Sequence, residues 1–149
     1  MRAFCARMGA TVPQRKALVL KASRILLSEK PLPERLQAFL EALLEGPFPI
    51  RSGKLYLRKG EGLRLVAQLG GEAGGEEVAL SLEGGGRALG RLSLRLAPAA
   101  SLAPEDRLAL EEAAGILALA LLRERAERAE RVLRRAGECA TQAAGEGDL

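Results

Sequence analysis

Two helical patterns of apolar residues open the chain. From 14 to 28 the apolar positions are too many for a single stripe, which predicts a helix that is covered on two sides. Thr11 and Gln14 have the spacing of a capping box, so this helix should begin between them. From 33 to 45 apolar residues recur every three or four positions, and this predicts an amphipathic helix that ends at Gly46.

The period then changes to two over four segments, 53–59, 63–69, 77–83 and 87–96. Alternation of this kind indicates strands with one dry and one wet face. The glycine-containing segments 59–62 and 84–86 predict hairpin turns. The dry face is expected to carry Leu55, Leu57, Leu63, Leu65, Ala67, Leu69, Val78, Leu80, Leu82, Ala88, Gly90, Leu92, Leu94 and Leu96.

A long helix is predicted from 104 to 136, with an acidic start that suits a helix N-terminus and Gly137 at its end. Its first half holds ten consecutive apolar residues, Ala113 to Leu122, too few for the ~20 that cross a bilayer. Such a run should be buried all round. The second half keeps only a narrow seam with coiled-coil spacing, formed by Leu122, Ala126, Ala129, Leu133 and Ala136.

These elements predict a two-layer α+β domain with an antiparallel sheet of about four strands, helices on one face and a long C-terminal helix. We expect a flexible N-terminal arm over 1–12, a domain over 13–136 whose last part, 123–136, projects, and a flexible tail over 137–149.

The wet face of the sheet has three open interpretations: a solvated surface, a protein-docking surface or a nucleic-acid surface. It carries many arginines, but Tyr56 is its only aromatic residue, whereas a nucleic-acid sheet needs several stacking platforms. Binding of nucleic acid is therefore not expected. If a partner docks on this face, the expected contacts are Tyr56, Arg64 and Arg91.

Composition limits the chemistry. The 149 residues carry a mild net charge of +4 and include no His, which excludes a Ser-His-Asp triad and histidine metal ligands. The two cysteines, Cys5 and Cys139, lie far apart with no CxxC spacing, so we expect reduced thiols, no metal and no cofactor. No signal peptide is recognisable, which favours the cytoplasm, and the absence of Asn in a charge-rich chain favours a thermophile.

The order helix, helix, hairpin, hairpin, long helix resembles that of GAF domains, which have a profilin-like superfold. The likeness spans 14–127 and is carried by GKLYLRKGEGLRLVAQLGG, EGGGRALGRLSLRL and LAPEDRLALEEAAGILALALLRERAE. The chain resembles a shortened, stand-alone GAF protein, because only residues 70–76 join the hairpins where the family usually has further strands and helices that close a ligand pocket. Sulfoxide-reducing and chromophore-binding relatives need cysteines inside the domain, and this chain has none there.

The resemblance implies a non-catalytic regulatory domain in signal transduction that acts as a homodimer through its terminal helices, by contact with itself or another signalling protein. From the residues themselves we expect no enzyme, no membrane partner and, because the wet face is mostly charged or polar and residues 70–76 are too few to form a wall, no closed pocket on that face. The alternative is a small-molecule sensor with an atypical or open pocket. The dimer interface is expected to contain Leu18, Ile25, Leu119, Leu122, Ala126 and Leu133.

Overall fold

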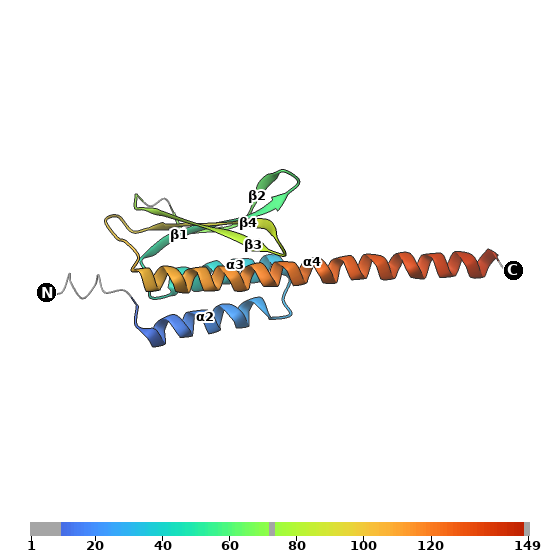
Figure 1. The fold of residues 1–149 in the computed structure, drawn as a ribbon, viewed down its shortest axis with the longest axis horizontal. Coiled ribbons are helices and arrows are strands. Elements are labelled where there is room, and N and C mark those ends of the chain that lie inside the picture. Colours follow the sequence, from blue (N-terminus) through green and yellow to red (C-terminus); the bar gives the residue numbers. More distant parts are fainter. Residues whose placement is uncertain (1–9, 72–73, 148–149) are drawn as a thin grey trace.

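A four-stranded antiparallel sheet forms one side of the computed structural model, which describes residues 10–71 and 74–147, with side chains as far as residue 137 (Figure 1). The strands stand in the order β2-β1-β4-β3. The two hairpins turn through glycines with positive φ, Gly60 in the first and Gly85 and Gly86 in the second, as the sequence predicted. The strand bounds are β1 (Ile50–Lys59), β2 (Gly62–Leu69), β3 (Glu77–Gly84) and β4 (Arg87–Leu96).

All three helices that the structure describes lie on the same side of the sheet (Figure 1). They are α2 (Val12–Leu26), α3 (Leu32–Glu45) and α4 (Pro104–Gly147). The capping box before α2 is confirmed: the Thr11 backbone N–H donates to Gln14 Oε1 over 2.8 Å, and the Gln14 N–H donates to Thr11 Oγ1 over 3.3 Å. None of the helices is both long and apolar enough, within the described residues, to span a membrane.

The hydrophobic core lies between the sheet and the layer formed by α3 and α4, which confirms the predicted α+β class. Phe39 and Leu40 of α3 and Leu110 and Leu117 of α4 are fully buried against the strand residues. α2 packs on the far side of α3 and α4 from the sheet, where it covers their outer surfaces (Figure 1).

α4 is a single helix of 44 residues, and two expectations about it are corrected. It does not end at Gly137, because helical backbone continues through the segment that was expected to be a flexible tail, as far as Gly147. Most of the apolar run from Ala113 to Leu122 is covered by the sheet and by α2 of the same chain, so it does not require a second copy for its burial. Only Gly115 and Leu119 of this run are exposed.

Two β-bulges change the faces of residues that strict alternation had assigned. In β4 the register shifts so that Leu82 pairs with Gly90 and Glu83 with Ala88, and the extra residue, Leu89, turns inward and is 1% exposed. In β2 the extra residue is Val66, because Leu55 pairs with Ala67 but Tyr56 pairs with Leu65. Beyond these bulges the predicted core positions Ala88, Leu63 and Leu65 are exposed.

The start of α4 is joined to the segment before α2 by Asp106, the one buried charged residue in the described part of the chain. Both of its carboxylate oxygens accept from the Ala10 backbone N–H over 3.2 Å, and Arg15 Nη1 lies 3.3 Å from Oδ1. Arg15 also donates to the Ala10 carbonyl oxygen. Ala10 is therefore buried, although it falls within the arm expected over 1–12; residues 1–9 of that arm lie outside the described residues.

Candidate functional site

A largely apolar seam, interrupted by Glu112 and partly covered at Leu122, runs along the outer surface of α4. The spacing found in the sequence between Leu122 and Ala136 continues towards the helix start, through Leu119, Gly115, Glu112 and Leu108, in steps of three and four residues. Leu108 is 64% exposed, Leu119 67% and Leu133 73%, and their shared spacing makes them one continuous stripe rather than scattered surface leucines. The seam comprises Leu108, Glu112, Gly115, Leu119, Leu122, Ala126, Ala129, Leu133 and Ala136.

The six residues predicted for a dimer interface do not form one surface. Leu119, Ala126 and Leu133 are exposed on the seam. Leu122 is partly buried, because it packs over Gly84 at the turn of the second hairpin, where a Cβ would have no room. Ile25 is partly buried against the core. Leu18 is 4% exposed and packs by Gly46 at the end of α3, so it offers almost no surface to a second chain.

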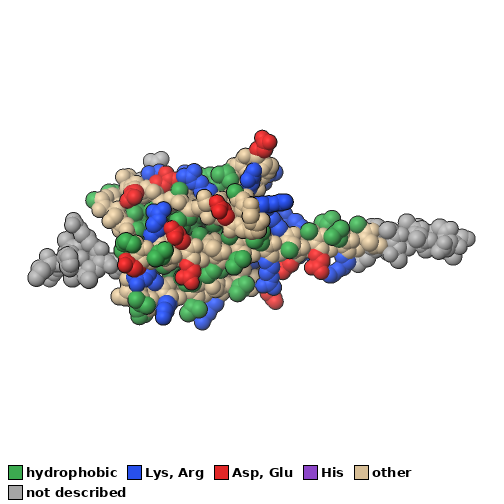
Figure 2. All heavy atoms as spheres, in the orientation of Figure 1, with side chains coloured by type: hydrophobic (Ala, Val, Ile, Leu, Met, Phe, Trp, Pro, Cys, Tyr) green, Lys and Arg blue, Asp and Glu red, His purple; other side chains and the backbone are tan. Residues whose placement is uncertain are grey.

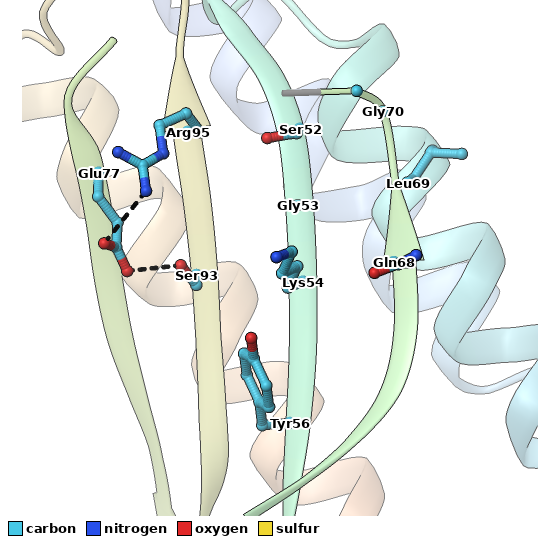
Figure 3. Close-up of a pocket in the computed structure, with 11 residues that line it drawn as sticks. Ser52, Gly53, Lys54, Tyr56, Gln68, Leu69, Gly70, Glu77, Ser93 and Arg95 are labelled. Carbon is cyan, nitrogen blue, oxygen red and sulfur yellow. Dashed lines mark hydrogen bonds and ion pairs between the residues drawn. The ribbon is translucent and has the colours of Figure 1, made fainter. Parts of the chain in front are cut away.

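A second candidate site is an open hollow of about 720 Å³ on the outer face of the sheet, the face turned away from the helices (Figure 3). Neighbouring strands supply its polar side chains, because the register sets Lys54 of β1 between Gln68 of β2 and Ser93 of β4. The ring of Tyr56 stands at one end, with its hydroxyl directed towards Lys54 and Ser93. The lining residues are Ser52, Gly53, Lys54, Tyr56, Gln68, Leu69, Gly70, Gly71, Glu77, Ser93 and Arg95.

Glu77 of β3 is the electrostatic centre of this hollow. The Ser93 hydroxyl donates a hydrogen bond of 2.7 Å to Glu77 Oε1, and Arg91 and Arg95 lie 3.3 Å and 3.6 Å from its carboxylate oxygens. The pKa of Glu77 is lowered below its ordinary value, first by the Ser93 hydrogen bond and then by the positive charges of Arg95, Arg91 and Lys54, while desolvation opposes the shift. The carboxylate therefore stays ionised and organises the cations around it.

The three residues proposed for docking are divided between the two faces of the sheet. Tyr56 and Arg91 pair directly across β1 and β4 and share the outer face, as predicted. Arg64 pairs with Leu57 and lies on the helix side, because the Val66 bulge reverses the alternation of β2. The uninterrupted apolar run Leu65-Val66-Ala67 was the one sign of this bulge in the sequence.

The chemistry available in the hollow is polar. Lys54, Ser93 and Arg95 could hold an anionic group, while Glu77 could accept hydrogen bonds from a ligand. Among the described residues, no three His, Cys, Asp or Glu side chains come together in a way that could bind a metal ion. The side chains of Cys5 and Cys139 lie outside the described part of the chain.

Comparison with known proteins gives matches in structure only. No protein-family profile matches the chain, and no curated protein matches it significantly. The GAF domain of a phosphoenolpyruvate-protein phosphotransferase from Coxiella burnetii has a TM-score of 0.65 at 14% identity, with 80% of this chain aligned to 99% of that chain. The nlh2 GAF domain from A. aeolicus, in an inactive state, has a TM-score of 0.59 at 12% identity, with 75% of this chain aligned to 98% of that chain.

A third match corrects the prediction that the protein is not an enzyme. The free methionine-R-sulfoxide reductase from Neisseria meningitidis, in complex with its substrate, has a TM-score of 0.66 at 18% identity, with 79% of this chain aligned to 95% of that chain. Enzymes therefore share the fold, and neither the architecture nor the lack of histidine excludes catalysis. Together the topology and these likenesses identify the fold of this chain as GAF-like.

Proposed function

We propose that this chain is a GAF-type regulatory domain that acts as a homodimer through the seam of α4. The observation that carries the proposal is the continuity of the seam, which runs from the part of α4 packed on the domain into the part that projects beyond it. Exposed leucines that recur at alternate steps of three and four residues favour a second helix over solvent. Figure 2 shows hydrophobic side chains along the projecting part of α4 as well as over the domain.

The charges beside the seam favour a parallel pair of helices. With Leu119 and Ala126 at a positions and Leu122 and Ala129 at d positions, Arg125 takes a g position and Glu130 takes the following e position. In a parallel, in-register pair, Arg125 of each chain would face Glu130 of the other, which supplies two symmetric attractions. The small residues at 115, 126 and 129 would let the two backbones approach closely. Such a pair could carry a signal as a change in the register or angle of the two helices.

Light scattering at micromolar concentration tests this proposal. The wild-type chain should be a dimer, and the double substitution Leu119→Glu with Leu133→Glu should make it a monomer, because four carboxylates would face one another across the seam. Leu122 is left intact because it also packs within the chain. The matched control is Leu63→Glu with Leu65→Glu, which makes the same chemical change at exposed leucines of β2 and should leave the dimer unchanged. A monomeric wild type, or a dimer that survives the seam substitutions, would show the proposal to be wrong.

A second candidate function is small-molecule sensing by the hollow on the outer face of the sheet. Its volume of about 720 Å³ is within the range of ligand sites, and Lys54, Arg95 and the Ser93–Glu77 pair supply converging polar groups. A thermal-shift screen of small carboxylates and phosphates tests this function, since a ligand that binds only the native state raises the unfolding midpoint. The rise should disappear in Lys54→Gln with Arg95→Gln, and a rise that persists there would exclude the hollow as the site.

A further inference from the structure

We propose that a groove on the helix side of the sheet binds a small anionic amphiphile, a molecule with an aliphatic tail and a carboxylate or phosphate head. This groove, here called the hairpin groove, lies between the first hairpin and the point where α4 leaves the domain, and its volume is about 410 Å³. Its lining includes Leu57, Arg64, Val66, Leu89 and Arg125. Figure 2 shows Lys and Arg side chains gathered in this region of the molecule.

The floor of the hairpin groove is aliphatic, and the two β-bulges build it. Leu89 reaches the floor only because the bulge in β4 turns it inward, and Val66 is the extra residue of the bulge in β2. Leu57 of β1 lies between them, and Leu32 and Leu121 close the floor from the helices. Bulges are frequent beside functional sites because they re-aim side chains, and here two of them converge on one groove.

The rim of the hairpin groove is cationic. Arg58, Lys59, Arg64, Arg125 and Arg128 line it, and none of these five forms an ion pair with any residue that the structure describes. Arg64 stands there because the β2 bulge moves it off the outer face.

The one carboxylate at the rim already has a partner. Glu124 is held by Arg35 at 3.0 Å in a pair whose side chains are only 12% and 19% exposed. Adjacent to the rim, Arg58 and Arg125 also line a second hollow together with Arg87. This excess of unpaired positive charge beside an apolar floor is complementary to an anion with an apolar tail.

The lining excludes other classes of small ligand. A nucleotide base or another flat ring would be expected to stack on an aromatic side chain, and none of the residues that line the hairpin groove is aromatic. The volume lies near the lower end of the range for small-molecule sites, which suits a short acyl chain better than a protein segment.

The groove is separate from both surfaces described above. It lies on the opposite face of the sheet from the hollow around Glu77, and of its α4 residues only Arg125 also flanks the seam, while Leu121, Glu124 and Arg128 point away from it. An occupant would contact the hairpin and the root of the projecting helix at once. The inference does not rest on dimerisation, because binding can be measured whatever the oligomeric state.

Isothermal titration calorimetry with sodium decanoate tests the proposal, with decanol as a probe that has the same tail and no charge. Decanoate should bind with saturation at one site per chain, and Arg64→Gln with Arg128→Gln should weaken binding by about tenfold or more, because two charge-assisted contacts are removed and neither residue flanks the seam. The matched control is Arg91→Gln with Arg95→Gln on the outer face, which should leave decanoate binding unchanged. Circular dichroism checks that each variant is folded, and Leu89→Phe provides a second variant that fills the floor without a change in charge.

Several outcomes would overturn the proposal. The proposal is wrong if decanoate binding does not saturate, or if decanol binds as tightly as decanoate. It is also wrong if decanoate binding is weakened in the outer-face variant and not in the groove variant. If an acidic polyglutamate peptide binds and decanoate cannot displace it, the cationic rim of the hairpin groove is a binding surface for a protein partner. That result would also refute a small-molecule site.

Discussion

Asp106 offers a quantitative test of how the two ends of the domain are joined. It is 1% exposed at the start of α4. Its carboxylate binds the backbone N–H of Ala10, which precedes α2, and the side chain of Arg15, which lies near the start of α2. The substitution Asp106→Asn keeps the size of the side chain but removes the charge and replaces one acceptor oxygen with an NH₂ group. The amide oxygen can take the place of Oδ1, which accepts from both the Ala10 N–H and Arg15, but the NH₂ group would then stand where Oδ2 accepts from the Ala10 N–H, so one donor would oppose another.

The loss of stability in Asp106→Asn depends on which polar groups are left buried without a partner. Loss of one partner of a fully buried ion pair costs about 3–5 kcal/mol, but the side chain of Arg15 is 20% exposed and can regain some hydration. Hydrogen bonds to charged groups contribute about 1.5–3 kcal/mol, and one acceptor survives in the amide. An acidic group in the first turn adds about 0.3–1 kcal/mol through the helix dipole. We therefore expect Asp106→Asn to lower the free energy of unfolding by about 2–3 kcal/mol.

Urea denaturation at neutral pH measures this loss. The matched control is Glu105→Gln, an exposed acid in the same turn, which should lower the free energy of unfolding by no more than about 1 kcal/mol, the contribution of the helix dipole alone. Combining Arg15→Gln with Asp106→Asn should cost less than the sum of the two single changes, because both remove the same contact. Equal and small effects of Asp106→Asn and Glu105→Gln would refute the view that this contact anchors the segment before α2.

Two further predictions concern the sheet. Leu89→Ala should lower the free energy of unfolding by about 2–5 kcal/mol, because the bulge buries this side chain. Leu63→Ala, at a position 52% exposed, should change the free energy of unfolding by no more than about 0.5 kcal/mol. Equal losses in urea titrations would contradict the observed register. Because the folded-state pKa of Glu77 is lowered, its carboxylate stabilises the fold at pH values above its unfolded pKa, and this increment is lost as the pH falls through the folded pKa. The stability difference between wild type and Glu77→Gln should therefore shrink on acidification, and a difference that grows in acid would contradict the assigned direction.

The sequence predicted the elements well wherever local chemistry decides them. The capping box at Thr11 and Gln14 and the glycine turns at 60 and 85–86 act within a few residues, so they could be recognised without tertiary information. The boundaries of β4 also agree, and alternation correctly assigned Leu92, Leu94 and Leu96 to the core.

The candidate sites were harder to predict, because they depend on contacts between distant segments. A bulge shows in the sequence only as a break in alternation. Leu89 was therefore left out of the predicted dry face, and Arg64 was placed on the wet face. The burial of Leu18 depends on its contact at the end of α3, which the pattern of α2 alone does not reveal. The helix beyond Gly137 was missed because glycine often ends helices, whereas here the helical backbone passes through it.

The uninterrupted length of α4 has a mechanical consequence. No break in helical backbone separates the part packed on the domain from the part that projects. The projecting part therefore behaves as a lever whose fulcrum is formed by the contacts of Leu122 with the second hairpin and of Glu124 with Arg35. Residues 123–147 span about 37 Å at a rise of about 1.5 Å per residue. A tilt of about 5° at the fulcrum would therefore displace the far end by about 3 Å, so a movement too small to disturb the core becomes a shift comparable with the width of a side chain.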